Sequence, residues 1–197
     1  MLRSFILLLV FGIELVAQRG PGQLDTIPAG SRVEYKTFQS KLLGRDLRYG
    51  IYLPPSYAGS TKRYPVLYFL HGMFENEMRW STRGQTDLML DRMIADDKIG
   101  EFIVAIPFGG TSFYTNTRDG TEKWEDMVVT EFLPMIETAY RVQATRATRG
   151  ISGTSMGGYG ALKIAMKYPD IFGSVSAHSA VLLQDLSAAR VSDRRLQ

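Results

Sequence analysis

The glycine-rich stretch around Ser155 is the feature that most restricts the possible folds of this chain. It reads Gly153-Thr154-Ser155-Met156-Gly157 and continues with glycines at 158 and 160. An apolar segment precedes it and an amphipathic helical pattern follows, so the motif predicts a sharp strand-to-helix turn with a serine at its tip. Glycine on both sides of the serine lets strand and helix approach closely. We therefore predict that Ser155 is a catalytic nucleophile; the alternative is a glycine-rich turn without chemistry.

Strand and helix patterns alternate along the rest of the chain. Alternating or continuous apolar runs predict strands at 33–38, 47–53, 64–70, 101–107, 148–153 and 172–180. Helical periods predict helices at about 86–97, 124–140 and 159–167, the second broken or kinked at Pro134. A hairpin followed by strand–helix alternation predicts an α/β fold with a mostly parallel sheet and helices on both faces.

The N-terminus differs in kind from the rest of the chain. Arg3 precedes an apolar run at 5–13 that is too short to span a bilayer, and the small residue Ala17 closes the segment. We therefore expect a signal peptide at 1–19, a linker at 20–32, a domain at 33–180 and a polar tail at 181–197. The expected location is secreted or periplasmic, without stable membrane insertion after signal cleavage. A buried N-terminal strand or helix is the alternative.

The composition excludes several classes of function. The net charge is only +3 and no basic stripe alternates with aromatic residues, so we do not expect nucleic-acid binding. The chain has no cysteine, which excludes a disulfide framework, a lipoprotein anchor and a cysteine nucleophile. No spacing of histidine and acidic residues is typical of a metal site, and we expect no cofactor.

A second group of candidate residues follows the apolar run at 64–70. It reads His71-Gly72-Met73. A backbone N–H at such a strand end and the N–H of the residue after the nucleophile can together bind an oxyanion. Met73 and Met156 are therefore the expected oxyanion-hole donors. The His71 ring is expected to fix the loop, since a base follows the serine in this chain order. His71, Gly72, Trp80 and Tyr114 are expected to border the substrate, and core packing is the alternative for Trp80 and Tyr114.

These segments together resemble the Putative esterase family of α/β-hydrolases. The motifs that carry the resemblance lie at 64–72, 107–114, 124–126, 131–134 and 155–162. The family includes S-formylglutathione hydrolase (esterase D), feruloyl and enterochelin esterase domains, and the mycolyltransferases. The resemblance implies an α/β-hydrolase fold and ester chemistry through Ser155. Phe108 departs from the pattern, because relatives often carry aspartate after the proline; this weakens the case for a polar substrate contact there.

The resemblance also implies an acid and a histidine after the serine. The segment after Ala180 is short and polar, so we expect the C-terminal strands of the sheet, with two triad members, to be missing. His178 is the candidate base, because its strand returns to the edge that carries Ser155; a packed or hydrogen-bonded histidine is the alternative. Asp170 is expected to be a turn residue beyond the helix. Asp185 would orient a base only if the tail folds back.

The expected function is that of a serine carboxylic-ester hydrolase that works through an acyl-enzyme on Ser155. Its expected partner is a small-molecule ester or an acylated carbohydrate. With the acid and histidine missing, we expect weak or no turnover from the chain as it stands. An acyltransferase of the mycolyltransferase type and a non-catalytic truncated remnant are the alternatives.

Overall fold

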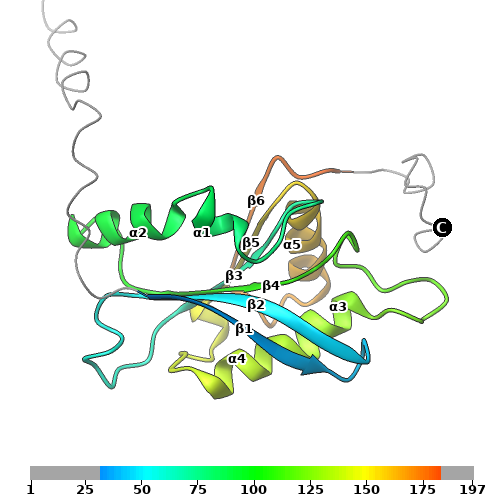
Figure 1. Cartoon of the computed structure of the whole chain (residues 1–197), viewed down its shortest axis with the longest axis horizontal. Helices are drawn as coiled ribbons and strands as arrows, with labels where there is room; N and C mark the ends of the chain where they lie inside the picture. The colour runs from blue at the N-terminus through cyan, green and yellow to red at the C-terminus, as the bar shows by residue number, and fades with distance from the viewer. Residues whose placement is uncertain (1–31, 183–197) are drawn as a thin grey trace, which may run out of the picture.

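The computed structural model describes residues 32–182, which form a six-stranded sheet with helices on both faces (Figure 1). The predicted signal peptide, nearly all of the linker and the tail beyond Leu182 lie outside these residues. Within 32–182, no helix has the length and apolar character needed to cross a bilayer.

The sheet combines an antiparallel hairpin with a parallel half. Its strands are β1 (Arg32–Ser40), β2 (Arg45–Leu53), β3 (Val66–Leu70), β4 (Ile103–Pro107), β5 (Arg149–Thr154) and β6 (Ser174–His178). The spatial order is β1-β2-β4-β3-β5-β6, and β3 pairs in parallel with both β4 and β5. β5 pairs in parallel with β6, whereas β1–β2 and β2–β4 are antiparallel. The α/β prediction is confirmed.

Helices cover the sheet on two sides. They are α1 (Arg79–Thr82), α2 (Thr86–Ala95), α3 (Trp124–Asp126), α4 (Leu133–Ala139) and α5 (Met156–Lys167). α1 and α2 supply Trp80 and Leu90 to a small core that also contains Tyr52. α3 and α4 lie on the opposite face (Figure 1). Together with α5 they enclose a larger core. The alternation of β2 between the two cores explains its pattern, since Ile51 faces one and Tyr52 the other.

The helical stretch that contains Pro134 is continuous but irregular. A π-helical segment, Met127–Phe132, joins α3 to α4, and Pro134 is the second residue of α4. Proline has no N–H and its ring crowds the carbonyl of the preceding turn, and a widened turn is one way for a helix to absorb this. The predicted irregularity is therefore present as a π segment rather than a break.

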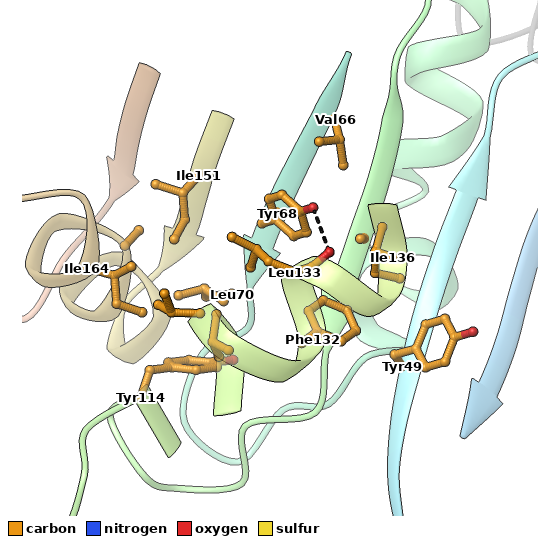
Figure 2. Close-up of a cluster of buried hydrophobic side chains, with 14 of the residues drawn as sticks. Tyr49, Val66, Tyr68, Leu70, Tyr114, Phe132, Leu133, Ile136, Ile151 and Ile164 are labelled. Carbon is orange, nitrogen blue, oxygen red and sulfur yellow. Dashed lines mark hydrogen bonds between the residues drawn. The ribbon is translucent and has the colours of Figure 1, made fainter. Parts of the chain in front are cut away.

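The larger core fixes the position of the strands that lead to Ser155. Figure 2 shows Tyr68 and Leu70 of β3, Ile151 of β5 and Ile164 of α5 in one buried cluster. The Tyr68 hydroxyl donates a hydrogen bond to the Leu133 carbonyl of α4 at 3.5 Å. These contacts hold β3, β5 and α5 together, so the loops at their ends have a rigid base.

Candidate active site

Ser155 lies at a strained turn between β5 and α5. Its backbone has φ 54° and ψ −113°, in a region that residues other than glycine rarely adopt. The Ser155 N–H donates to the His178 carbonyl at 2.8 Å, and its own carbonyl accepts the Tyr159 N–H at 3.1 Å. The strain is thus held by bonds from the neighbouring strand and the helix, while the serine itself stays half-buried.

The glycines around Ser155 permit this turn. A Cβ at Gly153 would lie 2.3 Å from the backbone of Gly157, and a Cβ at Gly157 would lie 1.9 Å from the Leu70 carbonyl oxygen. Real Cβ atoms do not approach backbone this closely, so both positions require glycine. The close approach predicted from the sequence is present, and it places the start of α5 directly against the end of β3.

The loop after β3 lies beside this turn. Leu70 is the register partner of Gly153, so the chain leaves both strands at the same level. A Cβ at Gly72 would lie 3.5 Å from the Thr154 carbonyl oxygen. Among residues 32–182, neither the Met73 N–H nor the Met156 N–H has a hydrogen-bond acceptor. The first N–H groups of a helix lack partners and carry its positive dipole end, so an anion would be stabilised here.

His71 is buried and joins two loops. Its Nε2 accepts the Gly109 N–H at 2.9 Å, so the proton is on Nδ1, which donates to the Gly72 carbonyl at 2.8 Å. Burial lowers the pKa of the His71 imidazole below its usual 6.5. The ring is therefore neutral, with both nitrogens engaged, in a loop-fixing position.

His71→Gln is expected to reduce the pH dependence of stability between about pH 7 and pH 5. A histidine with a lowered folded pKa binds its proton more readily in the unfolded chain, so stability falls as pH drops below 6.5. One proton limits this slope to about 1.4 kcal/mol per pH unit. Denaturant titrations across this range measure it. A slope in His71→Gln equal to that of the wild type would contradict a neutral His71.

His178 lies at the end of β6, opposite Thr154 in the register. Its backbone carbonyl holds the Ser155 N–H, and its side chain is exposed. In the part of the chain that the structure describes, no hydrogen bond joins its ring to the Ser155 hydroxyl. Asp170 lies in an exposed turn beyond α5, as expected, and Asp185 is outside the described residues.

The structure places Trp80 and Tyr114 in the two cores rather than on a surface that a substrate can reach. Trp80 is 7% exposed and packs against Tyr52, with ring centroids 5.9 Å apart. Tyr114 is fully buried, and its ring lies 5.9 Å from that of His71. Both rings therefore fit the packing alternative, because they are enclosed in the two cores.

Lys163 of α5 is a supporting residue that the sequence patterns did not reveal. Its ammonium donates to the Tyr114 carbonyl at 3.1 Å and to the Thr115 hydroxyl at 2.7 Å. It also pairs at 2.7 Å with Glu125, which is 4% exposed. The one sequence signal is a lysine on an otherwise apolar helix face. Through these bonds α5 holds the loop that carries Tyr114.

No group of histidine, cysteine and acidic side chains within residues 32–182 could hold a metal ion. The candidate site thus contains a strained serine, two backbone N–H groups without an acceptor among the described residues, and a buried histidine that fixes the adjacent loops.

A serine held at positive φ between a parallel strand and a helix defines the α/β-hydrolase class, and solved structures agree. A ferulic acid esterase superposes with a TM-score of 0.73 at 38% identity, covering 77% of this chain and 59% of that one. The serine hydrolase FphF of Staphylococcus aureus is similar in fold, with a TM-score of 0.71 at 21% identity, covering 85% and 64%.

This chain belongs to the Putative esterase family, whose sequence profile matches residues 40–189. It is 34% identical over 148 residues to an endo-1,4-beta-xylanase/feruloyl esterase of Xylanibacter ruminicola, which covers 72% of this chain and 20% of the relative. It is 33% identical over 169 residues to S-formylglutathione hydrolase of Arabidopsis thaliana, covering 77% and 57%. The chain thus spans 20% of the length of the first relative and 57% of the length of the second.

Proposed function

We propose that the chain is a serine esterase in which Ser155 forms the acyl-enzyme. The observation that carries this proposal is the backbone of Ser155 at φ 54°, strained at the tip of the β5–α5 turn. Strain of this kind persists only where the surrounding structure enforces it, and it is typical of functional positions. The relatives named above are esterases and hydrolases, so we propose hydrolysis rather than transfer to another alcohol.

The proposed reaction follows from the geometry of the turn. The Ser155 hydroxyl loses its proton to a base and attacks the ester carbonyl. The carbonyl oxygen becomes an oxyanion, which the N–H groups of Met73 and Met156 stabilise because they have no other acceptor within the described residues. Collapse of this intermediate releases the alcohol, which takes up a proton, and leaves the acyl group on Ser155. Water then attacks the acyl-enzyme and releases the acid.

His178 is the proposed base among the two histidines of the sequence. Both ring nitrogens of His71 are engaged by backbone groups, whereas the His178 ring is exposed at the end of the strand next to Ser155. For substrates we propose small-molecule esters or acylated carbohydrates, supported by the feruloyl esterase name of one relative.

A fluorophosphonate probe tests the nucleophile directly. We expect a covalent adduct at Ser155, located by mass spectrometry of the digested protein, because Ser155 is the proposed nucleophile and the two proposed oxyanion donors would stabilise the phosphonyl oxygen. Ser155→Ala should give no adduct. Ser174→Ala, an exposed serine of β6, is the matched control and should be labelled like the wild type. An adduct that persists in Ser155→Ala would rule out the proposed nucleophile.

Hydrolysis of p-nitrophenyl acetate separates the base from the nucleophile. If His178 is the base, His178→Asn lowers the rate as Ser155→Ala does. A rate lost in Ser155→Ala but retained in His178→Asn would keep the esterase assignment and remove His178 from it.

A further inference from the structure

Phe74 occupies a position in the loop after β3 where a glycine would be expected. The Glu75 N–H donates to the Gly72 carbonyl at 3.2 Å, so residues 72–75 form a tight turn with Phe74 as its third residue. Phe74 has φ 63°. Turns with positive φ at the third position favour glycine or asparagine, because a Cβ crowds the backbone there. A phenylalanine at this position therefore carries a conformational cost.

Packing does not offset this cost at Phe74, although it does at two other aromatic residues. Phe113 and Tyr114 also have positive φ, but they are 3% and 0% exposed and lie in the large core. Phe74 is 88% exposed. It therefore gains almost nothing from burial in the folded chain while it bears the strain.

Two acidic residues anchor the loop that carries Phe74. Glu75 accepts the Gly72 N–H at 3.0 Å and pairs with Arg79 at 3.3 Å. Glu77 is 1% exposed and pairs with Arg48 at 3.0 Å. Glu75 closes the turn itself and Glu77 follows it by two residues, so the exposed ring is carried by an anchored loop.

The position of Phe74 in the chain places its Cα next to that of a proposed oxyanion donor. Phe74 directly follows Met73, whose N–H is a proposed oxyanion donor, and successive Cα atoms are about 3.8 Å apart. Aromatic rings attract each other at centroid separations of about 4.5–7 Å. A planar group attached to a carbonyl held at Met73 is therefore within reach of the Phe74 ring.

We propose that Phe74 is a specificity-determining residue whose ring stacks on a planar apolar acyl group and so favours esters of aromatic acids over short aliphatic ones. The inference rests on the proposed function of Ser155. It accounts for the strain and the exposure together, since substrate binding supplies the contact that Phe74 lacks within residues 32–182.

The test compares two methyl esters, which share one leaving group. Phe74→Gly should lower the ratio of kcat/KM for methyl ferulate to that for methyl acetate about tenfold, equivalent to about 1.4 kcal/mol. Phe74→Asn, a second variant without the ring, should lower this ratio by a similar factor. Phe74→Tyr, which keeps an aromatic ring, should leave the ratio unchanged. Met166→Ala, which truncates a 76% exposed side chain near the far end of α5, is the matched control and should also keep it. Thermal unfolding should show the glycine and asparagine variants at least as stable as the wild type.

Equilibrium binding of ferulate to Ser155→Ala, with and without Phe74→Gly, gives a readout that needs no turnover. If Phe74→Gly weakens ferulate binding about tenfold, the inference is supported, even if no variant hydrolyses an ester. An absence of hydrolysis would overturn the proposed function alone. An unchanged ester ratio together with Ser155-dependent hydrolysis would overturn the inference and leave the proposed function intact. Ferulate binding that is absent, or equal in both proteins, would also overturn it.

Discussion

Gly157→Ala is expected to lower the free energy of unfolding by about 3 kcal/mol or more and to abolish probe labelling of Ser155. The added Cβ would lie 1.9 Å from the Leu70 carbonyl oxygen and 2.4 Å from its carbonyl carbon. Both atoms belong to the backbone of β3, which is paired on both sides by β4 and β5. Neither can move away without breaking the centre of the sheet, so α5 must shift and the turn at Ser155 must change.

Gly100→Ala is the matched control for this substitution. No atom lies within 4 Å of the position that its Cβ would take, and its φ is not positive. Alanine there should leave stability unchanged or raise it by up to about 1 kcal/mol, because it restricts the unfolded chain. Denaturant-induced unfolding of both variants measures the difference. Equal midpoints would show that β3 and α5 are not as closely packed as the structure has them.

Tyr114→Ala is expected to cost about 3–5 kcal/mol of stability, in the range of other large-to-small substitutions in cores. The fully buried ring fills a slot made by two glycines: a Cβ at Gly109 would lie 2.3 Å from the ring, and a Cβ at Gly160 2.9 Å from the Tyr114 Cβ. Its removal leaves a cavity between the loop after β4, the loop after β3 and α5. Labelling of Ser155 should fall with stability, because His71 loses its neighbour.

Tyr114→Phe separates the ring from its hydroxyl. The hydroxyl donates to the His71 carbonyl at 3.4 Å, a long bond, so its loss should cost about 1 kcal/mol or less. Chemical denaturation of the two variants gives the comparison. If alanine were tolerated as well as phenylalanine, the ring would not support the site.

The elements that could be predicted from the sequence are those with a local pattern. The helix predicted at 86–97 is Thr86–Ala95, and the strand predicted at 64–70 is Val66–Leu70. Both rest on apolar periodicity, which burial against the sheet enforces. The ends are less certain, because a strand stops where its partner stops: the run at 172–180 forms a strand only at Ser174–His178.

The same division holds for the site. The turn at Ser155 and the loop at His71 are encoded by short motifs whose glycines have a local steric reason. The burial of Trp80 and Tyr114, and the bonds of Lys163 to the Tyr114 loop, depend on contacts between segments far apart in the chain. No local pattern carries this information. The sequence around an aromatic residue is the same whether its ring points to solvent or into a slot between two glycines.

The hydrogen bond from the Ser155 N–H to the His178 carbonyl sets an order of events during synthesis. β5 and α5 precede β6 in the chain, yet the serine is held by β6. Gly158 of α5 also lies close to the segment after β6, since a Cβ added to it would be 3.1 Å from Ala180. A nascent chain that has reached only the end of α5 contains the complete motif but lacks the bond that holds the serine. The reactive conformation is therefore set only after the following strand has emerged and docked.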